Sequence, residues 1–341
     1  MRDSTLTGQE TQVATRTLTY AAALNEALRE EMHRDASVFC IGEDIAVWGG
    51  GGVYGVTKGL AEEFGLERVR DTPISEEAIV GMSVGAAIAG LRPVAEIMYS
   101  DFLALAMDPL VNQAAKLRYM FGGQGSVSMV VRSNSGAPGG KAAQHSQSLE
   151  AWFMHVPGLK VVTPATPFDA KGLLKSAIRD PNPVVFLEHK RLYRTTGEVP
   201  AGEYLVPIGR ADIKRNGRDV TIVSSQTMVL EALEAANDLS ASGIEVEVVD
   251  VRTLKPLDME TILDSVRKTS RLIVVHEANV FAGWGAEILA RVAQVGFDLL
   301  DAPMLRVGAK DAPIPYSEPL EAAILPDKED IVAAVRTTVM F

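Results

Sequence analysis

The segment Asp71–Pro93 reads DTPISEEAIVGMSVGAAIAGLRP. It predicts a helix followed by the start of a strand. Glu76 and Glu77 occupy the first helical turn, where the positive end of the helix dipole favours negative charge. Small residues then recur four apart on one helix face: Gly81, Gly85 and Ala89. Because such a face lets a second backbone approach closely, we expect a tight helix–helix contact here, either within the fold or between subunits.

On both sides of this segment, apolar strands alternate with amphipathic helices. Residues 17–35 carry alanines and leucines at helical spacing, and Thr166 and Pro167 give a later helix an N-cap and a first-turn proline. A further helix is predicted over 102–120. Strands are predicted over 37–41, 91–98, 126–132, 159–163 and 183–188, and loops over 48–56 and 133–147. The alternation predicts an α/β fold with a largely parallel sheet and helices on both of its faces.

The pattern breaks over residues 193–209, which lack a hydrophobic period and are predicted to be a linker. A second α/β unit follows, with strands predicted at 219–225, 244–251, 271–276 and 303–307, and helices at 228–239, 259–268 and 283–295. The sequence therefore predicts two doubly wound α/β domains, over 16–192 and 210–341. The polar residues 1–15 are expected to form a disordered tail.

Composition excludes several classes of protein. The chain has 341 residues, of which 47% are hydrophobic and 23% charged, as in ordinary globular proteins. Its formal net charge of -11 argues against binding to nucleic acid or to an anionic membrane surface. A single cysteine excludes an internal disulfide. No apolar run reaches the roughly 18 residues of a membrane span, and no signal peptide is visible, so we expect a cytoplasmic protein.

A series of short motifs carries a family resemblance. The spacing of Glu76, Gly81 and Gly85 resembles the pyrimidine-binding half of thiamine-diphosphate enzymes. The other motifs are Gly42-Glu43-Asp44, Arg92-Pro93 and residues 71–76 (DTPISE), 119–123 (YMFGG), 142–147 (AAQHSQ), 157–162 (PGLKVV) and 169–173 (DAKGL). From about residue 16 to the C-terminus, the chain closely resembles the β subunit of the decarboxylase component of 2-oxoacid dehydrogenase complexes. The resemblance implies a pyrimidine-binding domain followed by a transketolase C-terminal-like domain.

The resemblance implies two catalytic residues. Glu76 matches the glutamate that hydrogen-bonds the aminopyrimidine ring of thiamine diphosphate and promotes the imino tautomer, which removes the thiazolium proton. A carboxyl group suits this task because it can share a proton with a ring nitrogen in a dry pocket. His145 matches the histidine of the active-site loop, which would handle protons and assist transfer to lipoamide. Outside this context, a lone loop histidine is a surface residue.

Two further residues match positions at the cofactor. Glu43 follows the first predicted strand, at the end where open α/β sheets place their ligands, and matches an acidic position near the cofactor. The alternative is a solvated loop charge beside Asp44. Phe102 matches the aromatic residue that packs on the pyrimidine ring, and the alternative is a core aromatic residue. His276 ends a strand, and the sequence does not separate a structural from a functional role for it.

The family can also bind potassium through backbone carbonyls and an acidic side chain. The matching positions here are Met129, Ala177, Ile178, Asp180 and Asn182. Ordinary turn chemistry around Pro181 is the alternative explanation for the last two of these residues.

One motif of a complete thiamine-diphosphate site is absent. The sequence contains no Gly-Asp-Gly, the signature that is followed by an asparagine and holds the diphosphate through magnesium. We therefore expect an α subunit to supply the magnesium and diphosphate half of the site. The resemblance implies a heterotetramer of two α and two β subunits, and docking of the C-terminal domain onto a lipoyl-bearing dihydrolipoamide acyltransferase. The docking module of that acyltransferase is typically basic, which fits the acidic charge of this chain.

The sequence leaves the substrate open. Residues 48–58, 120–123 and 188–190 look more like acetoin-type than pyruvate-type relatives, and branched-chain 2-oxoacids are a third choice. Two other functions also stay open at this point. One is a split transketolase-like enzyme that uses sugars and needs no lipoyl partner, and the other is a non-catalytic α/β assembly module that has kept the fold.

Overall fold

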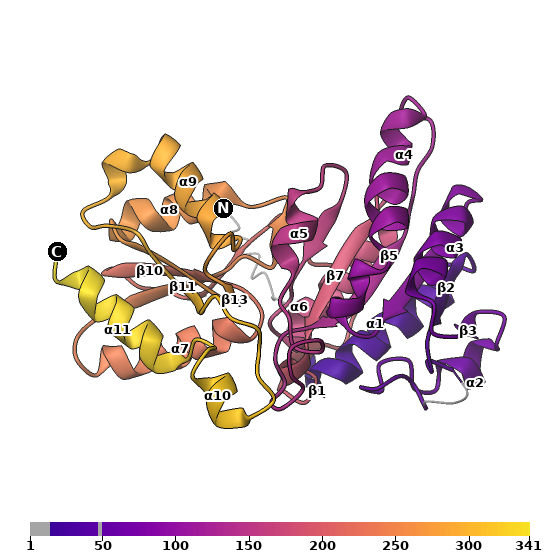
Figure 1. Ribbon diagram of the computed structural model, residues 1–341, viewed down its shortest axis with the longest axis horizontal. Coiled ribbons are helices and arrows are strands. Elements are labelled where there is room, and N and C mark those ends of the chain that lie inside the picture. Colours follow the sequence, from indigo (N-terminus) through magenta and orange to yellow (C-terminus); the bar gives the residue numbers. More distant parts are fainter. Residues whose placement is uncertain (1–13, 47–49) are drawn as a thin grey trace, which may run out of the picture.

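The computed structural model describes residues 14–46 and 50–341, and within them the chain forms two α/β lobes that lie side by side (Figure 1). The N-terminal half, coloured indigo to magenta, builds the right-hand lobe, and the orange-to-yellow C-terminal part builds the left-hand lobe. Parallel strands with helices on both faces make up each lobe, so the predicted doubly wound α/β architecture is confirmed. No helix in the described ranges is both long and apolar enough to cross a membrane.

The N-terminal lobe is built on a large sheet with the strand order β12-β6-β7-β5-β4-β2-β3. These strands are β2 Val38–Gly42, β3 Val69–Asp71, β4 Arg92–Ile97, β5 Val130–Ser135, β6 Lys160–Val162, β7 Val184–His189 and β12 Thr253–Lys255. The helices of this lobe are α1 Tyr20–Arg34, α2 Leu60–Phe64, α3 Glu76–Ile88, α5 Glu150–His155 and α6 Pro167–Arg179. Successive residues of a strand point to opposite faces, so Cys40 packs beneath α1 and α6 while Ile41 packs against α3.

The C-terminal lobe repeats this design with the strand order β14-β13-β10-β11-β9. Its strands are β9 Asp212–Arg215, β10 Val220–Ser224, β11 Val246–Asp250, β13 Leu272–Asn279 and β14 Leu305–Ala309. Its helices are α7 Thr227–Ser240, α8 Met259–Thr269, α9 Gly285–Val295, α10 Glu318–Ala322 and α11 Lys328–Val339. Helices α7 and α11 cover one face, and α8 and α9 cover the other.

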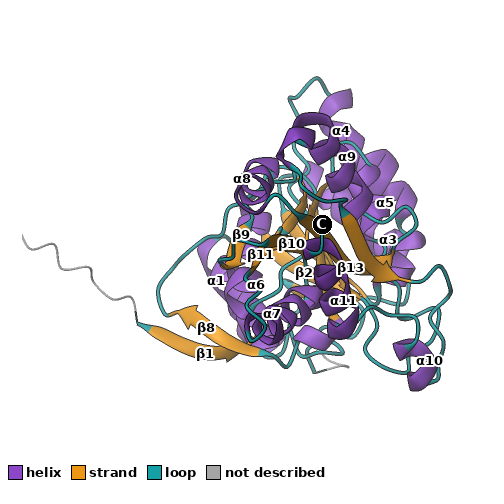
Figure 2. Cartoon of the chain, turned by 90° about the vertical axis from the view of Figure 1, so that its left-hand side faces the viewer, coloured by secondary structure: helices purple, strands orange, loops and turns teal. Residues whose placement is uncertain are grey.

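A two-stranded antiparallel ribbon departs from the sequence-based prediction. It pairs β1 Thr15–Thr19 with β8 Thr196–Pro200, and it lies at the edge of the molecule (Figure 2). The predicted linker over 193–209 therefore contains a strand, and Thr15, the last residue of the predicted tail, is the first residue of β1. Residues 1–13 of that tail lie outside the described residues. The helix predicted over 17–35 starts at Tyr20, since the Thr19 side chain caps it by accepting from the Ala22 N–H.

The apolar stretch after β4 also differs from its prediction. Instead of one helix over 102–120, it forms the 3-10 turn η1 Ser100–Ala104, the π-helical turn η2 Asp108–Ala114 and the short α4 Ala115–Met120. Pro109 at the start of η2 lacks an N–H group, which interrupts regular α-helical bonding. The strand predicted over 126–132 likewise lies further along the chain, as β5. In contrast, the predicted cap of α6 is confirmed, because Thr166 Oγ1 accepts from the Asp169 N–H at 3.1 Å.

A charged cluster lies buried at the centre of the large sheet. Arg132 on β5 donates to Glu96 on β4 at 2.6 Å and to both carboxylate oxygens of Glu188 on β7 at 2.7 and 2.8 Å. The Tyr193 hydroxyl also donates to Glu188, at 2.6 Å, and the Tyr193 ring stacks on Tyr54 with centroids 4.1 Å apart. The cluster thereby ties the glycine-rich loop that holds Tyr54 to the sheet, next to the site described below.

Candidate active site

Two buried carboxylates, Glu43 and Glu76, lie close together at the carboxyl edge of the large sheet. Glu43 follows β2 directly, and Glu76 begins α3, which comes after the neighbouring parallel strand β3. They are 8% and 7% exposed. Burial raises the pKa of Glu43, and the nearby charge of Glu76 raises it further, against the hydrogen bond from the Ser75 backbone N–H. The alternative of a solvated loop charge for Glu43 is therefore wrong.

The Glu43 carboxylate has one oxygen without a protein partner. Its Oε1 atom is buried and finds no hydrogen-bond partner among the described residues. Leaving a buried acceptor unsatisfied costs about 1–3 kcal/mol, so such an atom at a ligand-binding edge indicates a missing donor. The amino group of an aminopyrimidine is a donor of this kind.

Next to the carboxylates, the strand order places an aromatic cluster at the same edge. The His145 ring meets the edge of Phe102 at 5.3 Å between centroids and that of Tyr99 at 5.4 Å. Phe102 and Tyr99 lie at η1, directly after β4, whereas His145 comes from the loop after β5. Burial, assisted by the nearby Tyr99 side chain, raises the pKa of Tyr54. The structure thus brings together Phe102 and His145, which the sequence placed in separate motifs.

The loop that carries His145 is held by η1. Its neck is closed by a hydrogen bond from the Gly136 N–H to the Gln147 carbonyl oxygen, at 3.1 Å. Asp101 Oδ1 accepts from the Gln147 N–H at 3.1 Å and from its side-chain amide at 2.9 Å, and the Ser100 hydroxyl donates to the Gln147 carbonyl at 3.1 Å. The turn that positions Phe102 therefore also positions His145.

Tyr99, Asp101 and Lys190 are residues of this site that the sequence reasoning missed. The Lys190 Nζ lies 4.7 Å from the centre of the Tyr99 ring and donates to the Gly136 carbonyl at 2.9 Å. Burial lowers the pKa of Lys190 to about 8, although the charges of Asp101 and Glu277 oppose this. A signal was present for two of them, since Tyr99 and Asp101 flank Phe102 in the sequence. Lys190 lies in the stretch 188–190, which the sequence analysis connects only with the choice of substrate and not with the site.

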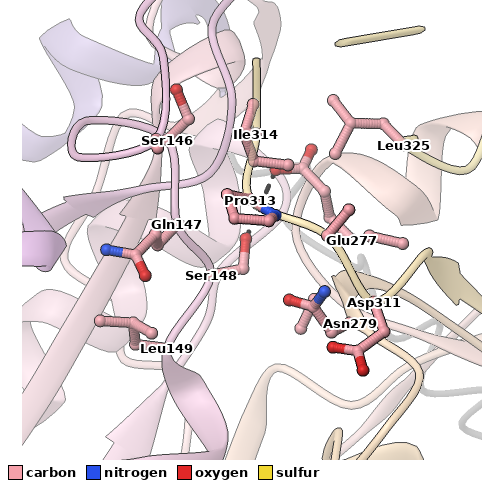
Figure 3. Close-up of a pocket in the computed structure, with 14 residues that line it drawn as sticks. Ser146, Gln147, Ser148, Leu149, Glu277, Asn279, Asp311, Pro313, Ile314 and Leu325 are labelled. Carbon is pink, nitrogen blue, oxygen red and sulfur yellow. Dashed lines mark hydrogen bonds between the residues drawn. The ribbon is translucent and has the colours of Figure 1, made fainter. Parts of the chain in front are cut away.

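A cavity of about 290 Å³ lies beside the loop, between Ser146–Leu149 and the C-terminal lobe. Figure 3 shows Ser146, Gln147 and Ser148 on one side of it, with Glu277 and Asp311 among the residues opposite. Ser146 Oγ is buried, and within residues 14–46 and 50–341 it has no hydrogen-bond partner. The loop is thus bordered by both halves of the chain.

Comparison with known proteins places this arrangement in a family. The family model "Transketolase, pyrimidine binding domain" matches residues 16–196, and "Transketolase, C-terminal domain" matches residues 209–331. The acetoin:2,6-dichlorophenolindophenol oxidoreductase subunit beta of Cupriavidus necator is 50% identical over 331 residues, which cover 95% of this chain and 98% of that relative. The pyruvate dehydrogenase E1 component subunit beta of Rhizobium meliloti is 49% identical, over 94% of this chain and 69% of that relative.

The chain belongs to this family of transketolase-like dehydrogenase β subunits. The mitochondrial pyruvate dehydrogenase E1 component subunit beta of Caenorhabditis elegans is 49% identical over 97% of this chain and 95% of that relative. A solved structure titled "Split gene transketolase, inactive beta4 tetramer" has the same fold, with a TM-score of 0.78 at 24% identity, over 95% of this chain and 98% of that one. The family resemblance that the motifs indicated is confirmed.

The β-subunit family is part of a thiamine-diphosphate-dependent system, and the residues at this edge fit one part of that cofactor. Two buried carboxylates, one with an unsatisfied oxygen, suit the polar edge of an aminopyrimidine, and the half-buried Phe102 ring offers an apolar surface. The other part has no counterpart here. The sequence has no Gly-Asp-Gly, and the described residues hold no cluster of three or more His, Cys, Asp or Glu side chains that could bind a metal.

The residues that match the potassium site of the β-subunit family lie around one turn after α6. Asp180 Oδ1 accepts from the backbone and side-chain amide of Asn182, both at 2.9 Å, and Lys160 pairs with the same carboxylate. The Ile178 carbonyl accepts from Arg92 at 2.8 Å. The Met129 and Ala177 carbonyls each accept a backbone N–H. Asp180 Oδ1 thus already accepts two hydrogen bonds, and two cationic side chains, Arg92 and Lys160, face this turn.

His276, the histidine left open by the sequence, is not among the residues that line the cavity beside the His145 loop. Its ring is 1% exposed, packs against Trp284 with centroids 5.0 Å apart, and Nδ1 lies 2.9 Å from the Ala278 carbonyl. Burial lowers its pKa to about 4. The glycines around it (Gly283, Gly285 and Gly308) leave room for the ring and for nothing larger. Its surroundings indicate a structural role.

Proposed function

We propose that this chain is the β subunit of a thiamine-diphosphate-dependent 2-oxoacid or acetoin dehydrogenase, with Glu76 and His145 as its catalytic residues. The observation that carries the proposal is the grouping of Glu43 and Glu76 with the Phe102–His145 pair at one sheet edge. The family to which the chain belongs supports the same activity. The bound cofactor would supply a nucleophilic carbon for carbon–carbon cleavage and for reductive acyl transfer to lipoamide.

Each residue has a distinct task in this proposal. The buried Glu76 carboxyl would hydrogen-bond the ring nitrogen of the aminopyrimidine, and Glu43 would accept from the ligand through Oε1, which has no partner among the described residues. Phe102 packs on the pyrimidine face. His145, in a loop at the cavity, exchanges protons with the reacting substrate and with the lipoyl group, a role that suits an imidazole near neutral pH.

We further propose that an α subunit completes the site by holding the diphosphate through magnesium. The absence of Gly-Asp-Gly supports this division, and so does the exposed apolar face of α3, where Met82 is 53% and Ile88 is 49% exposed. Such a face beside the cofactor residues suits a subunit contact. The α and β chains would then form the heterotetramer, with domains over 16–192 and 210–341 in this chain.

Two finer parts of the proposal rest on the family resemblance. A lipoyl-bearing acyltransferase would dock through the C-terminal domain, and the net charge of -11 would favour a basic docking module. Potassium would bind between the residue before β5 and the C-terminal end of α6, at Met129, Ala177, Ile178, Asp180 and Asn182. Arg92 and Lys160 already face this region. Potassium binding therefore predicts a higher melting temperature of the protein in potassium chloride than in sodium chloride, and equal melting temperatures would exclude the ion.

The function is tested by reconstitution with an α chain, which a neighbouring reading frame with Gly-Asp-Gly would identify. Pyruvate, acetoin and branched-chain 2-oxoacids are offered in parallel, with 2,6-dichlorophenolindophenol as electron acceptor. We expect no turnover from the isolated chain, and turnover of at least one substrate once the α chain, thiamine diphosphate and magnesium are present. Full activity of the isolated chain would exclude the two-chain site. No turnover of these substrates, together with transfer between sugar phosphates in a separate assay, would favour a split transketolase-like enzyme.

A further inference from the structure

The two ends of the His145 loop meet a side chain from the other half of the protein. Glu277, near the end of β13, accepts from the Ala137 N–H at 2.8 Å and from the Ser148 hydroxyl at 3.4 Å, both through Oε1. Figure 3 shows Glu277 reaching across the cavity toward Ser148. One carboxylate oxygen therefore joins the first and last parts of the loop to the C-terminal lobe.

The other oxygen of Glu277 is held by His189, at the end of β7. His189 Nε2 lies 2.9 Å from Glu277 Oε2, and the Arg191 backbone N–H donates to Nδ1 at 3.2 Å. Because Nδ1 accepts a hydrogen bond, Nε2 carries the proton and donates to the carboxylate. Burial disfavours the charged carboxylate and by itself raises the pKa of Glu277. The His189 ring and the Ala137 N–H favour the charged form more strongly, so the pKa of Glu277 is lowered.

The start of the loop is packed tightly onto this pair. Gly136 has a φ of +79°, and a Cβ placed on it would overlap the His189 ring and lie 2.7 Å from Glu277 Oε1. Lys190, the next residue after His189, donates to the Gly136 carbonyl at 2.9 Å. Position 136 therefore requires glycine both for its backbone conformation and for the close approach of the pair.

We infer that Glu277 and His189 form a clamp that positions the His145 loop for the reaction. Glu277 is a positioning residue in this role, because it contacts the loop backbone at Ala137 and not the His145 ring. Asp101 holds the same neck from the side of η1 through Gln147, so the loop is fixed from two directions. The inference deepens the proposed function and rests on it for its catalytic part, whereas the fixing of the loop does not depend on the reaction.

Two substitutions of Glu277 test the clamp in the reconstituted enzyme. E277A removes all three contacts, and E277Q keeps one carbonyl oxygen for the Ala137 N–H but loses the carboxylate that pairs with His189. Backbone hydrogen exchange of the 136–148 peptide, measured by mass spectrometry, should be faster in E277A than in wild type and intermediate in E277Q. The kcat should fall by roughly tenfold to hundredfold in E277A, with KM within about twofold, since misplacement of a catalytic group acts on the chemical steps.

A double substitution distinguishes positioning from a general loss of stability. If Glu277 acts through His145, then E277A should cause no further loss of kcat in the background of His145→Ala. The matched control is E247A, because Glu247 is another buried carboxylate of the C-terminal lobe, paired with Lys268 and with the Gly217 N–H at 3.3 Å. E247A should lower the melting temperature without changing exchange in the 136–148 peptide.

Unchanged exchange of the 136–148 peptide in E277A would overturn the clamp, and so would kcat losses that add fully to those of His145→Ala. An equal effect of E247A on that peptide would also overturn it. If instead the reconstituted wild-type enzyme turns over none of the offered substrates while E277A still loosens the peptide, the proposed function fails and the structural clamp stands.

Discussion

At the scale of single residues, Glu150 is a buried acid whose environment favours its neutral form. It is 2% exposed at the start of α5, and its Oε2 atom has no partner within the described part of the chain. Burial, assisted by the charge of Glu277, raises its pKa from 4.5 to about 7, against the hydrogen bond from its own backbone N–H. Because the folded pKa lies above the unfolded one, the unfolded chain loses this proton first, and stability falls as pH rises from about 4.5 to about 7.

The substitution Glu150→Gln tests this pH dependence. Glutamine imitates the protonated acid and does not ionise, so the variant should match wild type at pH 5 and exceed it at pH 8. A change of one pKa unit corresponds to about 1.4 kcal/mol. At pH 8 we therefore expect the free energy of unfolding of the variant to exceed that of wild type by on the order of 1–3 kcal/mol. Urea unfolding at both pH values measures it. An equal difference between variant and wild type at the two pH values would contradict the assignment.

The proposed role of Glu76 belongs to the same scale. Glu76→Gln in the reconstituted enzyme should slow exchange of the thiazolium proton of the cofactor by at least about a hundredfold, because an amide cannot share a proton with the ring nitrogen as a carboxyl does. Glu77→Gln is the control, since Glu77 is the next residue but points to solvent. Proton exchange followed by NMR after rapid quenching measures both variants. Wild-type exchange in the Glu76 variant would remove this residue from catalysis.

At the scale of elements, the small-residue face of α3 divides into two parts. A Cβ on Gly81 would lie 3.9 Å from the Pro109 side chain of η2, whereas at Gly85 nothing lies within 4 Å in the described structure. Helix α3 thus packs against η2 at Gly81 at an ordinary van der Waals distance that leaves room for a Cβ, and the face is open at Gly85. The close backbone approach that the small residues predict is not made within the described part of the chain. A bulky side chain at Gly85 fits the isolated chain and would obstruct a partner.

Gly85→Leu is therefore expected to separate folding from assembly. The isolated variant should be as stable as wild type or slightly more stable, because leucine in a helix is favoured over glycine by roughly 0.5–1 kcal/mol. Its binding to the α chain should weaken at least about tenfold, as measured by sedimentation at several concentrations. Ala22→Leu places the same side chain at an exposed position of α1 and serves as the control. Equal association of both variants would exclude α3 from the subunit contact.

Element boundaries show where local sequence patterns lose their predictive value. The Thr166 cap of α6 was predictable because the bond it makes to the Asp169 N–H spans three residues. Strand β1 was not, because its partner β8 lies far along the chain, with Thr15 opposite Pro200. Threonines in that strand have no strong helix preference, so pairing decided their conformation. The apolar run after β4 is visible in the sequence and predicts a single helix, but its periodicity does not show that the run forms the 3-10 turn η1 and the π-helical turn η2.

At the scale of the whole molecule, the two α/β units are joined more closely than a linker suggests. Strand β12, from the C-terminal part of the sequence, completes the large sheet by pairing with β6, so that Thr253 lies opposite Val162. The Lys255 Nζ then donates to the Met154 and Val156 carbonyls at 2.8 and 3.0 Å. This junction fixes the distance between β13 and the loop after β5. The hydrogen bond between Glu277 and Ala137 depends on that distance.

The alternation of strands and helices and the family are predictable from the sequence, because they depend on local periodicity and on short motifs. The same motifs propose Glu43, Glu76, Phe102 and His145 as site residues. The tertiary structure decided which side chains meet. Tyr99, Asp101, Lys190 and the pair of His189 with Glu277 reach the His145 loop from separate strand ends. Their convergence follows from strand order, since parallel strands bring distant carboxyl ends to one edge, and no local pattern encodes that order.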